Sequence, residues 1–200
     1  VGSSANAFTY KLNDNTKAGN YDITKIEGKL TVTNRDTKYE ITVEANSGSY
    51  IYDGTEKNVS GLKETTFTVD GNTYTVSGLT ASATGTNVSD SKAVTVTGVA
   101  VVKDSSDNDV TAQFTVKTVN GQLTITKRPV TLKSADLSKA YDGKALVNGA
   151  TALETETGWA DGEGATYTFT GSQTVVGSSA NAFTYKLNDN TKAGNYDITK

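Results

Sequence analysis

The chain of 200 residues contains no cysteine, no histidine and no methionine. These absences remove disulfides, thiol nucleophiles, the usual zinc ligands and the commonest general base at neutral pH. We therefore expect neither enzyme activity nor a cofactor. The net charge is only −3 and no basic cluster is present. Binding to nucleic acid by release of counterions is therefore not expected either.

Long apolar runs are also lacking. The longest, around Val99–Val102, has about five residues, whereas a membrane-spanning helix needs about 20. We expect no membrane insertion in this sequence. It also shows no signal peptide, so any export signal or anchor is expected to lie outside it. The apolar content of 35% favours small β modules with modest cores over one large globule.

What the sequence does contain is a long exact repeat, because residues 1–25 are identical to residues 176–200. Even the loop residues match, which a shared fold alone does not require. The period is 176 − 1 = 175 residues. The repeat predicts that the chain is one stretch of a near-identical tandem array.

A weaker repeat lies inside this period. "NYDITKIEGKLTVTNR" (20–35) resembles "QFTVKTVNGQLTITKR" (113–128), and Tyr-Asp-Gly occurs at 52–54 and at 141–143. We interpret 1–35 as the C-terminal half of a repeat module and 36–128 as a complete β module. Residues 129–200 are then a β module that lacks its last strand.

Alternation of apolar and polar residues predicts an all-β fold. The predicted strands are "KLTVT", "YEITVEA", "TFTVDGNTYTV", "AVTVTGVAVV", "QFTVKT", "QLTITK", "VTLKSA" and "ATYTFTG". Asp70-Gly71 and Asn120-Gly121 are turn signals. The best helical candidate, Asn148–Thr157, is rich in threonine and ends at Gly158, so we expect loop, strand or one short turn there.

The junctions between modules contain no Gly/Ser-rich linker. Only Lys127, Arg128 and Pro129 separate two alternating stretches, and proline has a fixed φ. We expect elongated modules arranged end to end in a stiff rod, with joints near Arg35 and Arg128. An immunoglobulin-like sandwich is the first candidate for each module, and an elongated β-grasp-like fold is the alternative.

The sequence resembles the Tyr-Asp-Gly and MBG-type tandem repeat domains of Gram-positive bacterial cell-surface adhesins. "SADLSKAYDGKAL" (134–146), "GWADGEGATYTFTGSQTVVGSSANAFTYKL" (158–187) and "NYDITKIEGKLTV" (20–32) carry this resemblance. It covers residues 129–200 densely and residues 36–128 loosely. The resemblance implies a secreted, all-β stalk anchored to the cell wall, and it assigns no ligand.

Two candidate sites involve aromatic residues. Asp-Gly is a turn former, so Tyr52 and Tyr141, which precede Asp53-Gly54 and Asp142-Gly143, are expected to pack their rings on the module core. Trp159 is a possible ligand contact, since an exposed indole can stack on a sugar ring. A lone tryptophan more often fills the core or a module interface.

The remaining candidates are charged. Glu154, Glu156, Asp161 and Glu163 contain the carboxylates that a glycosidase needs, but a solvated loop is favoured. Asp104, Asp107 and Asp109 are weak candidates for calcium, because they do not match an EF-hand loop. An isopeptide crosslink at Lys133 is disfavoured, because Glu44 takes the equivalent place in the other module.

We therefore expect a structural stalk of a surface adhesin or extracellular filament, whose partners are neighbouring modules or copies of the same protein. The alternative is a multivalent array with weak carbohydrate or host-protein sites. The module boundaries also predict an unpaired edge after Lys200. We expect residues 26–34 of a neighbouring molecule to fill it.

Overall fold

The computed structural model describes residues 1–33 and 36–200 and is all-β, as the sequence predicts. Strands make up 48% of the chain and helical residues 6%, with no helix of seven or more residues. In the described part of the chain, no helix is long and apolar enough to cross a membrane. The joint predicted near Arg35 lies outside the described residues.

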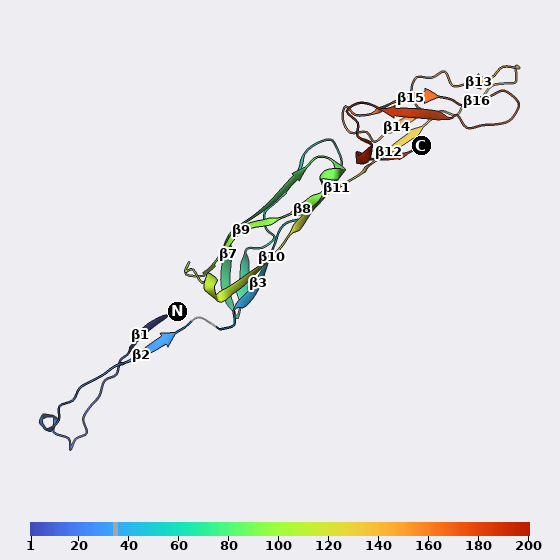
Figure 1. The fold of residues 1–200 in the computed structure, drawn as a ribbon. Helices are drawn as coiled ribbons and strands as arrows, with labels where there is room; N and C mark the ends of the chain where they lie inside the picture. The colour runs from blue at the N-terminus through green and yellow to red at the C-terminus, as the bar shows by residue number, and fades with distance from the viewer. Residues whose placement is uncertain (34–35) are drawn as a thin grey trace.

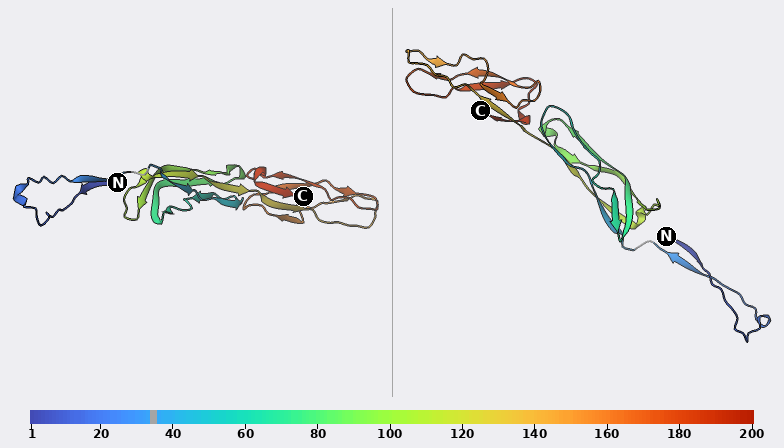
Figure 2. Two further views of the ribbon diagram at one scale, coloured as in Figure 1. Left: turned by 90° about the horizontal axis from the view of Figure 1, so that it is seen from below. Right: turned by 180° about the vertical axis from the view of Figure 1, so that it is seen from behind.

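Strand pairing divides the chain into three groups, which follow one another along an elongated molecule (Figures 1 and 2). The N-terminal hairpin pairs β1 (Gly2–Asn6) with β2 (Gly28–Val32) in antiparallel fashion. We call residues 39–126 the central segment and residues 128–199 the C-terminal segment. Among the described residues, no strand pairing joins one group to another.

The central segment begins with β3 (Tyr39–Glu44), which pairs in parallel with β10 (Phe114–Val119). A 3-10 turn, η3 (Thr111–Gln113), leads into β10. The last strand, β11 (Gly121–Thr126), lies between β4 (Gly48–Ile51) and β8 (Lys92–Val94). The other elements are β5 (Lys57–Ser60), β6 (Thr66–Val69), β7 (Asn72–Gly85), η2 (Val88–Asp90) and β9 (Val96–Asp104).

The C-terminal segment shares one feature of this arrangement, the parallel pairing of its first strand with the strand after a 3-10 turn. Its first strand, β12 (Arg128–Lys133), pairs in parallel with β18 (Tyr196–Thr199), which follows the 3-10 turn η4 (Ala193–Asn195). Arg128 faces Tyr196 as Tyr39 faces Phe114 in the central segment. The other strands are β13 (Leu146–Val147), β14 (Thr155–Thr157), β15 (Ala165–Phe169), β16 (Ser172–Gln173) and β17 (Phe183–Leu187).

Two clusters of buried apolar side chains stabilise the molecule. One cluster lies in the central segment alone, around Val43, Val102 and Phe114. The other continues from the central segment, where it includes Leu123, into the C-terminal segment, where it includes Leu132. The core is therefore continuous across the boundary at Arg128.

Each strand predicted from alternation is present, at least in part. The Asp70-Gly71 turn is confirmed, with φ of 47° and 79° between β6 and β7. Asn120-Gly121 is not a hairpin turn, because β10 and β11 pair with different strands. A Cβ on Gly121 would lie 1.9 Å from the carbonyl oxygen of Asn46, so glycine allows this close backbone approach.

The two identical copies adopt different structures. Residues 2–6 form β1, whereas the identical residues 177–181 form no strand. Conversely, β17 and β18 have no counterparts at the equivalent positions of the first copy. The 3-10 turn forms in both copies, as η1 (Ala18–Asn20) and as η4. A strand therefore forms only where this chain provides a partner for it.

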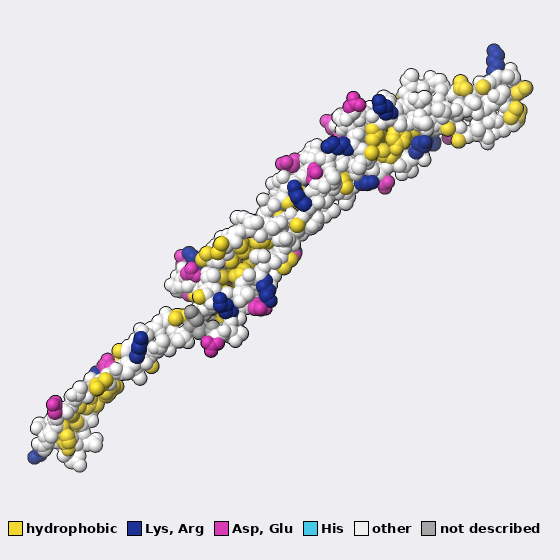
Figure 3. All heavy atoms as spheres, viewed as in Figure 1, with side chains coloured by type: hydrophobic (Ala, Val, Ile, Leu, Met, Phe, Trp, Pro, Cys, Tyr) yellow, Lys and Arg dark blue, Asp and Glu magenta, His cyan; other side chains and the backbone are white. Residues whose placement is uncertain are grey.

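The N-terminal hairpin is not a packed unit. None of the described residues 1–33 is buried, and Leu30 and Val32 are 53% and 68% exposed. Apolar side chains are visible along its surface (Figure 3). β2 is nevertheless paired within its own chain, because β1 lies along one side of it.

The matched positions Leu30 and Leu123 give a test of this contrast. Leu123 is fully buried, so Leu123→Ala should lower the free energy of unfolding by about 2–5 kcal/mol. Leu30→Ala in dilute solution should change it by less than about 0.5 kcal/mol, because this side chain is exposed. Denaturant unfolding followed by circular dichroism measures both. Equal losses would contradict the assignment of the core.

Candidate functional site

The most densely connected site is the joint between the central and C-terminal segments. Tyr52 follows β4, and its backbone N–H donates to the carbonyl of Thr126 (2.9 Å). Asp53 accepts from the backbone N–H of Thr55 (2.9 Å), which closes a turn, and Gly54 supplies the φ of 82° that this turn requires. The turn directs the Tyr52 ring toward the C-terminal segment, where it is 4% exposed.

An aromatic cluster lies across the joint. The rings of Tyr52 and Tyr196 meet edge to face with centroids 5.4 Å apart, and Trp159 meets Tyr196 in the same way at 4.8 Å. Edge-to-face pairs of this kind contribute about 0.5–1.5 kcal/mol beyond the burial of their area. Tyr52 comes from the central segment and its two neighbours from the C-terminal segment, so the cluster ties the segments together.

Glu163 binds both tyrosines. One carboxylate oxygen accepts from the hydroxyl of Tyr52, and the other accepts from the hydroxyl of Tyr196 (2.8 Å). The Tyr196 hydroxyl also accepts from the backbone N–H of Ala160 (3.1 Å). Both oxygens of the carboxylate are therefore occupied, and the contact with Tyr52 crosses the joint.

A second contact across the joint uses asparagines from the turns η2 and η4. Asn195, which is 2% exposed, accepts from the backbone N–H of Val88 (3.0 Å) and donates to the side-chain oxygen of Asn87 (3.0 Å). Lys192 donates to the same oxygen (3.3 Å). Asp90 in turn accepts from the backbone N–H groups of Asn87 and Thr86, and these hydrogen bonds lower its pKa to about 2.

Three features thus connect the two segments at the joint. They are the chain itself before Pro129, the hydrogen bonds of the two tyrosines to Glu163, and the hydrogen bond between the two asparagines. Arg128 adds a hydrogen bond from Nε to the carbonyl of Gly158 (2.5 Å). These contacts come from different elements of the two segments, so relative motion of the segments would have to break some of them.

The two Tyr-Asp-Gly motifs form the same turn in different surroundings. Asp142 accepts from the backbone N–H of Lys144 (2.9 Å), and Gly143 has a φ of 76°. Tyr141, however, is 69% exposed, so the expectation that its ring packs on the core is wrong. The partners of Tyr52 belong to the following segment, and among the described residues no aromatic ring packs on Tyr141 in the same way.

The acidic residues of the sequence analysis are engaged separately. Glu154 pairs with Lys133 (2.8 Å), and Glu156 accepts from Tyr167 (2.6 Å) and from the indole N–H of Trp159 (2.9 Å). Trp159 is half-buried, with its ring edge on Tyr196. Neither arrangement presents the paired, accessible carboxylates that glycoside hydrolysis requires.

The aspartates considered for calcium serve local structure. Asp104 accepts from Asn108 and Ser106, Asp107 pairs with Lys103 (2.9 Å), and Asp109 accepts from Thr111. Among the described residues, no group of three or more acidic side chains could hold a metal ion.

The sequence analysis missed the asparagine pair and the role of Glu163. Asn87 and Asn195 are 108 residues apart, and neither belongs to a recognisable motif. Glu163 was placed in an acidic loop because its two phenol partners lie far from it in sequence. No protein-family model, curated protein or solved structure matches the chain.

Asn195 and Asn20 occupy the same place in the two identical copies, which gives a matched pair of variants. Asn195→Ala should lower the free energy of unfolding by about 1–3 kcal/mol, since Asn87 and the Val88 N–H lose their partner. Asn20→Ala should have almost no effect, because Asn20 is exposed. The fluorescence of Trp159, the sole tryptophan, follows unfolding at the joint. A similar cost for both variants would contradict the role of Asn195.

High pH should loosen the joint. Burial, followed by the contact with Glu163, raises the pKa of Tyr196 from 10.0 to about 12 and also raises that of Tyr52. A raised pKa in the folded state means that this stabilisation is complete below pH 10 and is lost as the pH rises to about 12. Thermal unfolding between these pH values should show the loss. Tyr196→Phe should reduce this pH dependence and Tyr21→Phe should not. If stability falls equally steeply with pH in both variants, the role of Tyr196 is refuted.

Proposed function

We propose that this chain is a structural stalk, the repeat region of a bacterial cell-surface adhesin or extracellular filament that projects or links distal domains. The observation that carries the proposal is the joint at Arg128, where the apolar core is continuous and Asn195 and Glu163 bind across the boundary. A flexible string of domains needs no such contacts. An element that bears load or sets a spacing needs such contacts.

The segments are interpreted as modules arranged end to end. The central and C-terminal segments share the parallel pairing of their first strand with the strand after a 3-10 turn. Several small sheets surround the cores, and an immunoglobulin-like sandwich is our first proposal for each module, with an elongated β-grasp-like fold as the alternative. Near-identity of successive copies suits a stalk, because its length can change by whole repeats while every joint stays the same.

The extracellular location and the wall anchorage rest on the resemblance to adhesin repeats. The lack of cysteine and the mixed surface charge are compatible with both (Figure 3). The alternative, a binding array, has less support, since the Trp159 ring contacts Tyr196 and its N–H binds Glu156.

Small-angle scattering of the dilute monomer tests the stalk. β7 alone has 14 residues and spans about 46 Å at about 3.3 Å per residue. We expect a radius of gyration at least twice the roughly 16 Å of a compact 200-residue domain. A chelator should leave the maximum dimension unchanged. A compact particle, or a large change on chelation, would rule out a stiff metal-independent rod.

A further inference from the structure

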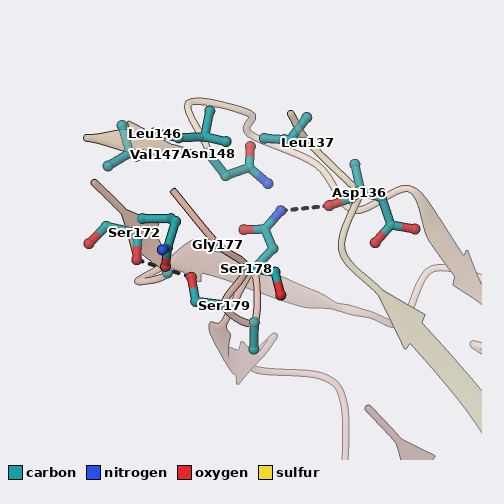
Figure 4. A pocket seen from close by; sticks show the side chains of 14 residues that line it. Asp136, Leu137, Leu146, Val147, Asn148, Ser172, Gly177, Ser178 and Ser179 are labelled. Atoms are coloured by element: carbon teal, nitrogen blue, oxygen red, sulfur yellow. Dashed lines mark hydrogen bonds between the residues drawn. The ribbon is translucent and has the colours of Figure 1, made fainter. Parts of the chain in front are cut away.

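The C-terminal segment has an open groove at the end distant from the joint. It is a cavity of about 220 Å³, with Asp136 and Leu137 on one wall and Gly177, Ser178 and Ser179 on another (Figure 4). A second cavity of about 240 Å³ adjoins it along Leu137 and reaches Tyr141. Together they extend along the edge of the segment.

Comparison with the central segment identifies what such a groove holds. Residues 137–140 precede Tyr-Asp-Gly as β4 does, and β4 pairs in parallel with β11. On its other side β11 pairs with β8 in antiparallel fashion, with Gly121 opposite Val94. In the central segment, the corresponding place is therefore occupied by a β-strand, with Leu123 and Ile125 buried.

The first copy of residues 177–181 has a strand partner in this chain. These residues are identical to residues 2–6, and residues 2–6 pair with β2. In both antiparallel pairs the last residue of one strand, Asn6 or Val94, faces the glycine at which β2 or β11 begins. β2 also carries Leu30 and Val32, which match the buried pair of β11 and are exposed here.

We infer that the groove of the C-terminal segment binds the β2 strand, Gly28–Val32, of a second copy of this chain. The incoming strand pairs with residues 177–181 in the register of β1–β2, so Leu30 lies opposite Ser179. It gains a second partner in residues 137–140. The side-chain amide nitrogen of Asn148, which is buried without a hydrogen-bond partner among the described residues, lines the groove and offers it a donor.

The β2 strand does not reach the groove of its own chain. The hairpin and the groove lie at opposite ends of the molecule, with the central segment between them (Figures 1 and 2). Donor and acceptor are different surfaces, so the contact is head to tail and does not close on itself. The result is a linear filament. β1 competes for the same strand, since it is an identical copy of the acceptor.

This competition provides matched variants of opposite effect. In an antiparallel pair, the backbone N–H of only every second residue points at the partner strand. Proline has no N–H, so replacing two adjacent residues by proline removes one that faces the partner. S178P/S179P should block the acceptor, and S3P/S4P, the same change in the first copy, should release β2. Sedimentation velocity over a range of concentrations measures association, and circular dichroism checks that the folds are intact.

We expect the mass of the unchanged chain to rise with concentration and S178P/S179P to remain monomeric. S3P/S4P should associate at about tenfold lower concentration, because β2 no longer has to leave β1. The inference would be overturned if S178P/S179P still associates. It would also be overturned if the unchanged chain and S3P/S4P both remain monomeric at every concentration. Neither result bears on the stalk proposal, which is tested on the monomer.

A crosslink tests the register. The chain has no cysteine, and directly opposed residues of an antiparallel pair lie within disulfide reach. Oxidised L30C/S179C should give a ladder of covalent multimers, whereas L30C/S178C should not, because a shift of one residue points the side chain to the other face. No ladder, or equal ladders, would contradict the proposed pairing.

Discussion

Backbone pairing with a partner distant in sequence decides which parts of this chain form strands. Two identical stretches of 25 residues provide the comparison. Tyr196 pairs with Arg128 in β12 and is 3% exposed, whereas Tyr21 has no such partner and is 62% exposed. Burying a large apolar side chain contributes about 1.5–3 kcal/mol. The parallel pairing of the first strand with β18 is therefore the contact on which the packing of the C-terminal segment depends.

Some features of the identical stretch form without that pairing. The 3-10 turn is present in both copies, and so is a contact between a lysine and a phenylalanine. Lys25 donates to the carbonyl of Phe8 at 2.9 Å, and Lys200 donates to the carbonyl of Phe183 at the same distance. These are local contacts, available to the stretch alone. Tertiary contacts account for the difference between the two copies: Asn195 is buried and hydrogen-bonded to the central segment, whereas Asn20 is exposed.

The sequence predicts the fold better than the site, for the same physical reason. Alternation in β3 or β11 reflects one buried face, so the strands can be identified locally. Short strands such as β13 and β16 have two residues each and leave no such pattern. The joint is less predictable, because Glu163 and Tyr52 are 111 residues apart. The Tyr-Asp-Gly turn is the same at both motifs, so the burial of Tyr52 and the exposure of Tyr141 reflect the surroundings of each motif and not its sequence.

The chemistry of the joint is a property of individual residues and not of the shared fold. At the equivalent end of the central segment, Phe114 takes the place of Tyr196 and Gln113 that of Asn195. Phe114 packs on Tyr39 and Tyr74 within its own segment and has no hydroxyl to offer a carboxylate. The two ends of the central segment therefore present different surfaces. The connection at Arg128 therefore depends on the side chains that meet there, both the continuous apolar cluster and the polar groups that bind across the boundary.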